Sequence, residues 1–134
     1  MEKHKRPGEI VAYEGKKFTS EWYYDDAGNS QALEYAESLE EAERKKLAAL
    51  FMVLGDLGQL RNKEKFRYEG DKIYAFKPKP HRFLAFFFEG AKVIVTNAFQ
   101  KKTDKLPSTE KERAIRCLKD YQLRVKAGNY YGKE

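Results

Sequence analysis

The sequence predicts an α+β fold in which an antiparallel sheet is accompanied by three helices. Two observations favour this class. Short runs of strand-like composition occur near the start of the chain and again between residues 65 and 99, and apolar residues at helical spacing occur before and after the second group. We expect a sheet of four or five strands with a mixed edge, two N-terminal helices and one C-terminal helix, in a single domain over residues 1–134.

The first elements are short. Residues 9–15 (EIVAYEG) are typical of a strand that ends at a glycine, whereas residues 16–26 fit a strand or a loop equally well. A turn follows at residues 25–30, where Asn29 or Ser30 can cap a short helix that carries Leu33 and Ala36.

The second helix has a clearer signal. Ser38 and Glu41 have the spacing of a capping box, with the serine at the N-cap and the glutamate at N3. A single apolar stripe then follows at helical spacing, made of Leu47, Leu50, Phe51 and Leu54. Gly55 is the expected stop.

The strand region begins with residues 65–77 (KFRYEGDKIYAFK), which predict a hairpin that turns at residues 69–71. Residues 78–80 (PKP) cannot continue a ladder, so we expect a turn there. Residues 81–89 (HRFLAFFFE) are apolar on both faces, as in a central strand covered on both sides. A tight turn at Glu89 and Gly90 leads into the next strand, AKVIVTNAF.

The last helix is predicted after Pro107. Thr109 and Glu112 have capping-box spacing, and apolar residues then recur at helical spacing at Ala114, Leu118, Tyr121 and Val125. We expect residues 125–134 to form a flexible tail.

Composition excludes several classes of protein. No apolar run approaches the roughly 18 residues of a membrane span, and the N-terminus lacks the apolar core of a signal peptide. The single cysteine, Cys117, rules out an intramolecular disulfide and a cysteine-based metal site. We therefore expect a cytoplasmic protein that does not associate with membranes.

The net charge of +6 is unevenly distributed. Residues 1–90 hold 16 basic and 16 acidic residues, whereas residues 91–134 hold 11 basic and 5 acidic ones. Within the first part, residues 61–82 are basic and residues 22–60 acidic. This pattern favours a polyanion-facing side, and the alternative is a solvated surface with ordinary charge scatter.

Familiar catalytic motifs are absent: there is no glycine-rich phosphate loop, no CxxC, no HExxH and no GxSxG. Neither a metal site nor a cofactor is expected. What remains is a set of basic residues with tyrosines among them, the chemistry of RNA contact, since cations neutralise phosphates and aromatic faces stack on bases. Those expected to bind RNA are Arg61, Lys65, Arg67, Arg113 and Arg116.

The same chemistry could cleave RNA without a metal, because fixed cations can stabilise the charge that develops when a 2′-OH attacks the adjacent phosphate. A lysine, tyrosine, histidine or carboxylate would then transfer the proton. For any one of these basic side chains, a solvated surface position is the simpler interpretation.

The C-terminal half carries a resemblance. Arg82 opens a strand, Gly90 makes the turn, and residues 99–103 (FQKKT) give a lysine motif that is followed in register by Pro107, Glu110, Ala114 and Tyr121. This pattern resembles the phage-derived, HigB-like branch of the RelE/ParE toxin superfamily. The resemblance extends over about residues 9–125 and is strong over the last forty or so.

The resemblance implies a RelE-like sheet with helices packed on one side. It implies a type II toxin that cleaves mRNA on the ribosome without a metal ion and is inhibited by a helix-turn-helix antitoxin, as a homodimer or a toxin–antitoxin heterotetramer. Phosphate contacts are expected from Arg82, Lys77, Lys101 and Lys102, and proton transfer from Tyr121 or a lysine.

Two positions depart from the family pattern. Ala75 and Lys77 stand where the family has Glu and Arg, and lysine keeps the charge but lacks the bidentate fork of arginine. The alternative is therefore a relative or phage accessory protein that binds without cutting, through RNA or ribosome binding or through ParE-like gyrase inhibition. Two interpretations of the lysine pair at residues 101 and 102 stay open: it holds a polyanion, or it protects an aggregation-prone hairpin.

Overall fold

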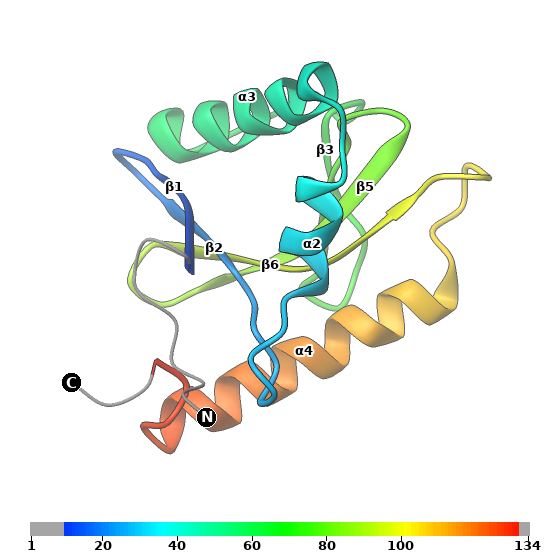
Figure 1. The fold of residues 1–134 in the computed structure, drawn as a ribbon. Coiled ribbons are helices and arrows are strands. Elements are labelled where there is room, and N and C mark those ends of the chain that lie inside the picture. Colours follow the sequence, from blue (N-terminus) through cyan, green and yellow to red (C-terminus); the bar gives the residue numbers. More distant parts are fainter. Residues whose placement is uncertain (1–9, 132–134) are drawn as a thin grey trace.

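The computed structural model describes residues 10–131 and confirms the α+β class, with a six-stranded sheet rather than one of four or five strands. Three helices that lie wholly within these residues accompany it, as expected (Figure 1). In chain order the elements are β1 (Val11–Glu14), β2 (Thr19–Trp22), α2 (Gln31–Glu37), α3 (Glu41–Leu57), β3 (Phe66–Tyr68), β4 (Tyr74–Phe76), β5 (His81–Phe88), β6 (Lys92–Gln100) and α4 (Ser108–Lys126). The arrangement is consistent with a RelE-like fold.

The strand order is β1-β2-β6-β5-β4-β3. All neighbours are antiparallel except β2 and β6, which run parallel from Thr19 beside Lys92 to Trp22 beside Val95. The segment that fitted strand or loop equally well thus contains a strand, β2, which joins the β1 hairpin to the rest of the sheet.

Helices cover both faces of the sheet, so the one-sided packing implied by the resemblance is wrong. In Figure 1, α3 lies on one side of the sheet and α4 on the other. Alternate side chains of β5 point in opposite directions: Phe83 packs in the cluster with α3, whereas Leu84 packs in the cluster with α4. A strand that is apolar on both faces needs cover on both.

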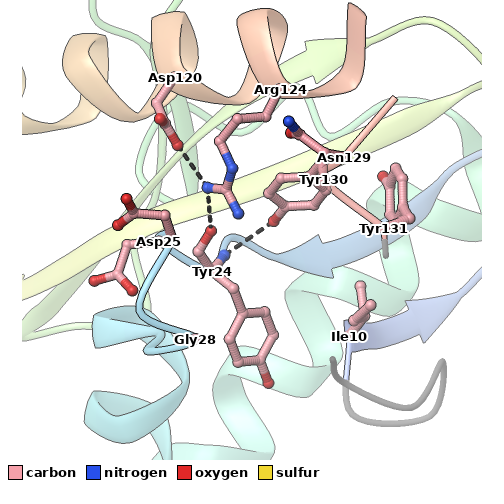
Figure 2. Close-up of a pocket in the computed structure, with 10 residues that line it drawn as sticks. Ile10, Tyr24, Asp25, Gly28, Asp120, Arg124, Asn129, Tyr130 and Tyr131 are labelled. Carbon is pink, nitrogen blue, oxygen red and sulfur yellow. Dashed lines mark hydrogen bonds and ion pairs between the residues drawn. The ribbon is translucent and has the colours of Figure 1, made fainter. Parts of the chain in front are cut away.

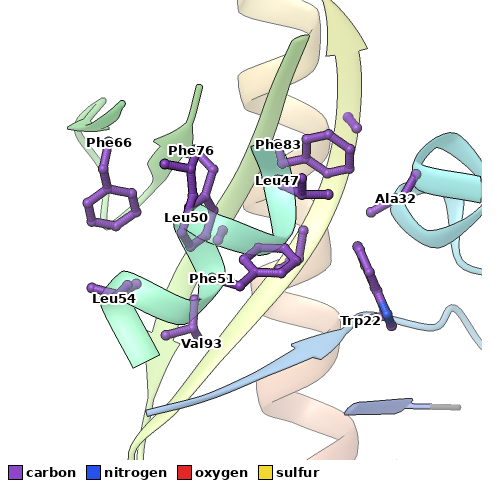
Figure 3. Close-up of a cluster of buried hydrophobic side chains, with 14 of the residues drawn as sticks. Trp22, Ala32, Leu47, Leu50, Phe51, Leu54, Phe66, Phe76, Phe83 and Val93 are labelled. Carbon is purple, nitrogen blue, oxygen red and sulfur yellow. The ribbon is translucent and has the colours of Figure 1, made fainter. Parts of the chain in front are cut away.

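The core on the α3 face is rich in aromatic residues (Figure 3). Phe51 of α3 makes edge-on ring contacts with Trp22 at 5.7 Å and with Phe76 at 4.9 Å between centroids. The predicted stripe of Leu47, Leu50, Phe51 and Leu54 is buried here, which confirms the helical periodicity.

One of the three predicted helix starts is confirmed in detail. The backbone N–H of Leu33 donates to the Ser30 hydroxyl at 3.2 Å, so Ser30 caps α2. Both predicted capping boxes are wrong. Glu40 is the N-cap of α3 and Pro107 that of α4, each without a side-chain cap, while Ser38 ends α2 and donates its hydroxyl to the Tyr35 carbonyl.

Gly55 does not end α3, which continues to Leu57 before Gly58 takes the left-handed conformation at φ +79°. Gly55 instead lies where the β1–β2 turn meets the helix, because its carbonyl accepts hydrogen bonds from the backbone N–H groups of Lys17 and Phe18. A helical glycine can therefore serve close packing as well as termination.

The predicted turns in the strand region are confirmed. β3 and β4 form a hairpin closed by a hydrogen bond from the Glu69 N–H to the Ile73 carbonyl, and β5 follows directly after residues 78–80. β5 and β6 pair along their length across the Gly90 turn, with one register shift after Leu84.

Residues 125–131 do not form the first part of the flexible tail expected over residues 125–134. α4 extends to Lys126, and Tyr130 and Tyr131 pack against Tyr121. Tyr131 also donates its hydroxyl to the buried carboxylate of Glu21 at 2.7 Å. Residues 132–134 lie outside the described part of the chain. No helix within residues 10–131 is long and apolar enough to cross a membrane.

Candidate anion-binding site

Four basic side chains from four strands or strand ends line one shallow hollow beside the loop that leads into α4. They are Arg67, Lys77, Arg82 and Lys101, here called the cationic cluster. The hollow has a volume of about 20 Å³, which is room for about one water molecule. A hollow this small suits contact with a charged group at the surface better than enclosure of a whole ligand.

Strand pairing explains why these residues meet. Arg67 lies opposite Ala75, and Arg82 lies opposite Phe99. Lys77 and Lys101 follow Ala75 and Phe99 by two residues, which is the repeat that returns a side chain to the same face of a sheet. The cluster therefore lies on the face that α4 covers farther along, where Ala75 and Phe99 belong to the core beneath the helix.

Arg82 is the most deeply buried member of the cationic cluster. It is 8% exposed, and Nη1 donates to the neighbouring His81 carbonyl at 3.0 Å. Among residues 10–131 no carboxylate forms an ion pair with it. Burial lowers the pKa of the Arg82 guanidinium, with partial compensation by Glu69. A buried arginine without an ion-pair partner favours an incoming anion.

Lys77 and Lys101 flank Arg82 in different ways. Burial, and then the positive charge of Arg82, lower the pKa of the Lys77 ammonium, whose Nζ donates to the Lys63 carbonyl at 2.9 Å. Lys101 pairs with Asp104 at 2.9 Å, and this hydrogen bond lowers the pKa of Asp104. Asp104 is exposed, so a stronger anion can replace it at little cost.

Two residues expected at the site lie elsewhere. Lys102 is exposed but does not line the hollow.

Tyr121 is 0% exposed, and its ring contacts Phe86 and Phe88. These two residues lie four and six positions from Arg82 along β5, which is about 13–20 Å at the rise of a strand. Burial raises the pKa of Tyr121 to about 12, and its hydroxyl bonds that of Tyr131 at 2.6 Å. Tyr121 is a core residue, and its expected role in proton transfer is wrong.

Of the five residues expected to bind RNA, only Arg67 belongs to the cluster. Arg113 and Arg116 line a separate hollow of about 300 Å³ beside Tyr23 and Cys117. Arg61 bonds Gln59 at 2.8 Å in the loop after α3, and Lys65 borders a hollow beside α3. The spacing of basic residues in the sequence does not show which of them share a hollow, because that depends on how α4 and the strands pack in the fold.

Four further residues of the hollow, three of them acidic or polar, were not among the expected site residues. Glu69 lies two residues after Arg67 and so returns to the same side, and Thr103, Asp104 and Lys105 come from the loop before α4. The alternation from Arg67 to Glu69 is a usable signal, although the sequence places Glu69 only in the predicted turn at residues 69–71. The hollow thus contains the half-buried Glu69 carboxylate beside the cationic cluster and a fifth basic residue, Lys105.

A hollow of about 410 Å³ lies beside the end of α4 (Figure 2). Its polar groups bond one another. Arg124 donates to Asp120 at 2.6 Å and to the Tyr24 carbonyl at 2.9 Å, and the Tyr24 N–H donates to the Tyr130 hydroxyl. These bonds attach the C-terminal segment to the chain after β2, so we assign the hollow a structural role.

Residues 10–131 contain no cluster of three His, Cys, Asp or Glu side chains that could hold a metal ion. The fold and the cationic cluster together define a small α+β protein with a predominantly basic hollow beside the loop that leads into α4. The chain belongs to the family described as Phage derived protein Gp49-like (DUF891), whose model matches residues 34–119. That range contains the whole cationic cluster. A comparison with curated proteins gave no match.

Proposed function

We propose that this protein is the toxin of a type II toxin–antitoxin pair, related to the RelE/ParE superfamily, and that it cleaves ribosome-bound mRNA without a metal ion. The observation that carries the proposal is the gathering of Arg67, Lys77, Arg82 and Lys101 around one hollow. Membership of a phage-derived family supports it. The expected partners are mRNA, the ribosome and a helix-turn-helix antitoxin, in the cytoplasm.

The chemistry follows from these side chains. The RNA 2′-oxygen attacks the adjacent phosphorus, the bond from phosphorus to the 5′-oxygen breaks, and a 2′,3′-cyclic phosphate remains. Arg82, Lys77 and Lys101 would stabilise the negative charge that develops on the phosphate oxygens, and loss of one such fixed donor costs roughly 10²–10³ in rate.

Arg67 compensates for the two departures from the family pattern. Ala75 contributes no functional group, and Arg67 lies directly opposite it on β3. The guanidinium that Lys77 lacks is thus available from the neighbouring strand. Since Tyr121 is buried in the core, Glu69 is the side chain placed to accept the 2′-OH proton, and the lowered pKa of Lys77 suits it to protonate the leaving 5′-oxygen.

Growth arrest tests the proposal. Induced expression without the antitoxin should stop growth, and Arg82→Ala combined with Lys101→Ala should relieve the arrest because two phosphate donors are lost. The matched control is Lys119→Ala, which removes an exposed cation from α4 outside the cluster. Thermal unfolding of the purified variants separates lost function from lost folding, and Arg82→Lys retains the charge at the buried position.

Arrest that persists in the folded double variant would contradict the proposed site. Rescue by co-expression of an adjacent gene that encodes a helix-turn-helix protein would support the toxin assignment whatever the target.

A binding protein that does not cut is the second candidate, and the observation in its favour is Ala75, at the position where the family carries an acid. Such a protein could inhibit gyrase or bind the ribosome. Growth arrest with intact transcripts and damaged DNA would favour gyrase inhibition, whereas discrete cuts in mRNA favour the nuclease.

A further inference from the structure

An apolar stripe on α3 has no partner in the described part of the chain. Of the five large apolar side chains that are exposed within residues 10–131, three lie on this helix. Val53 and Leu57 are 36% and 66% exposed, and with Ala49 they recur every four residues, so they share one side of the helix. Aligned exposure of this kind is typical of an interaction surface.

The stripe continues into a hollow of about 360 Å³ between α3 and the turn before β5. Ala49 and Leu50 form its wall on the helix, and Pro78 forms the opposite wall. The hollow lies on the α3 side, where Leu50 joins the core, whereas the cationic cluster lies on the α4 face of the sheet.

The rim of this hollow is basic. Lys46, Lys65 and Lys79 surround it with a single acid, Glu64, which Lys79 neutralises at 2.6 Å. Within residues 10–131, Lys46 and Lys65 form no ion pair. An apolar groove with an unneutralised cationic rim is complementary to an apolar segment flanked by carboxylates.

We infer that this surface, defined by Lys46, Ala49, Val53, Leu57, Lys65 and Pro78, docks an amphipathic helix of a partner protein that carries acidic residues beside its apolar face. Groove binding by a helix uses apolar anchors at the spacing that this stripe presents. A second copy of the chain is disfavoured, because a two-fold contact would bring two lysine rims together. The inference does not depend on RNA cleavage.

Model peptides of defined charge test the inference. The probe is a synthetic helix of about 18 residues with leucines on one face and glutamates beside them, and the comparison peptide has lysines in place of the glutamates. Binding is measured by fluorescence polarisation, and the site is mapped by amide chemical shifts in the ¹⁵N-labelled protein. We expect the acidic peptide to bind more tightly, with shift changes concentrated in α3 and around Lys65 and Pro78.

Two variants sharpen the test. Val53→Glu with Leu57→Glu should weaken binding of the acidic peptide at least about tenfold, because it places charge on the apolar anchors. Lys46→Glu with Lys65→Glu should reverse the preference in favour of the basic peptide. Leu123→Glu is the matched control, since Leu123 is 69% exposed on α4, and it should leave binding unchanged.

Three results would overturn the inference: equal binding of both peptides, shift changes centred elsewhere, or self-association that Val53→Glu abolishes. The last result would show that a second copy covers the surface. The substituted side chains are exposed, and an unchanged melting temperature would show that the variants are folded.

Discussion

At the scale of single residues, the cationic cluster brings like charges together at some cost to stability. Lys77 shows this most clearly, because burial and the nearby Arg82 both lower its pKa. A lysine whose pKa is lower in the folded than in the unfolded state destabilises the fold wherever it is charged, and this penalty is relieved as the pH rises through the folded pKa. Stability given up at one position in this way is typical of functional sites.

The first prediction concerns that penalty. Lys77→Met should raise the melting temperature at neutral pH, because it removes a partly desolvated charge beside Arg82, and should weaken RNA binding. Thermal unfolding and RNA titration of the same preparations measure the two effects. Lys119→Met, at an exposed position on α4, should change neither. A lower melting temperature for Lys77→Met would show that the lysine stabilises the fold.

At the scale of elements, residues 127–131, here called the C-terminal strap, pack against the sheet after α4 ends. Its anchor is Tyr131, which donates to Glu21 and bonds the Tyr121 hydroxyl, while Lys92 lies over its ring at 4.3 Å. Glu21 is 6% exposed, so its carboxylate depends on these partners. The sequence predicts a flexible tail here because tyrosines and glycines near a terminus carry no signal of a distant buried acid.

The second prediction concerns the loss of the Tyr131 hydroxyl from this segment. Tyr131→Phe removes the hydroxyl that donates to the buried Glu21 carboxylate, which keeps its ion pair to Lys92 at 3.7 Å, and should lower the free energy of unfolding by about 1–3 kcal/mol. Urea unfolding measures it. Tyr68→Phe is the matched control, because Tyr68 is 54% exposed, and it should cost little. Equal effects of the two substitutions would contradict a structural role for the strap.

The contact between β1 and α3 depends on a close approach of two glycines. A Cβ on Gly15 would lie 2.4 Å from the backbone carbon of Gly55, closer than real contacts allow. The β1–β2 hairpin can therefore rest directly on the helix only while position 15 lacks a side chain.

The third prediction follows from that contact. Gly15→Ala should destabilise the protein by about 1–3 kcal/mol through overpacking against backbone that cannot yield. Gly128→Ala, where a Cβ meets nothing within 4 Å but φ is +78°, isolates backbone strain and should cost about 1 kcal/mol. Chemical unfolding compares them, and a smaller loss for Gly15→Ala would argue against the close packing.

At the scale of the whole molecule, local sequence patterns predict the pairing of strands that are neighbours in the chain. The apolar alternation of β5 and β6 predicted a central hairpin, and its pairing explains why Arg82 and Lys101 lie together. The parallel pairing of β2 with β6 joins segments far apart in the sequence, and nothing in the four residues of β2 specifies it. Tyr121 was misplaced because helical spacing gives a buried face but not its distance from the site.

The central claim is that one cationic cluster on this scaffold binds the RNA backbone and promotes its cleavage. Primer extension on cellular mRNA, after expression of the protein or of its Arg82→Ala, Lys101→Ala variant, tests it most directly. The account predicts discrete cuts with the unaltered protein and none with the folded variant. Intact transcripts in growth-arrested cells, or cuts that persist in the variant, would contradict it.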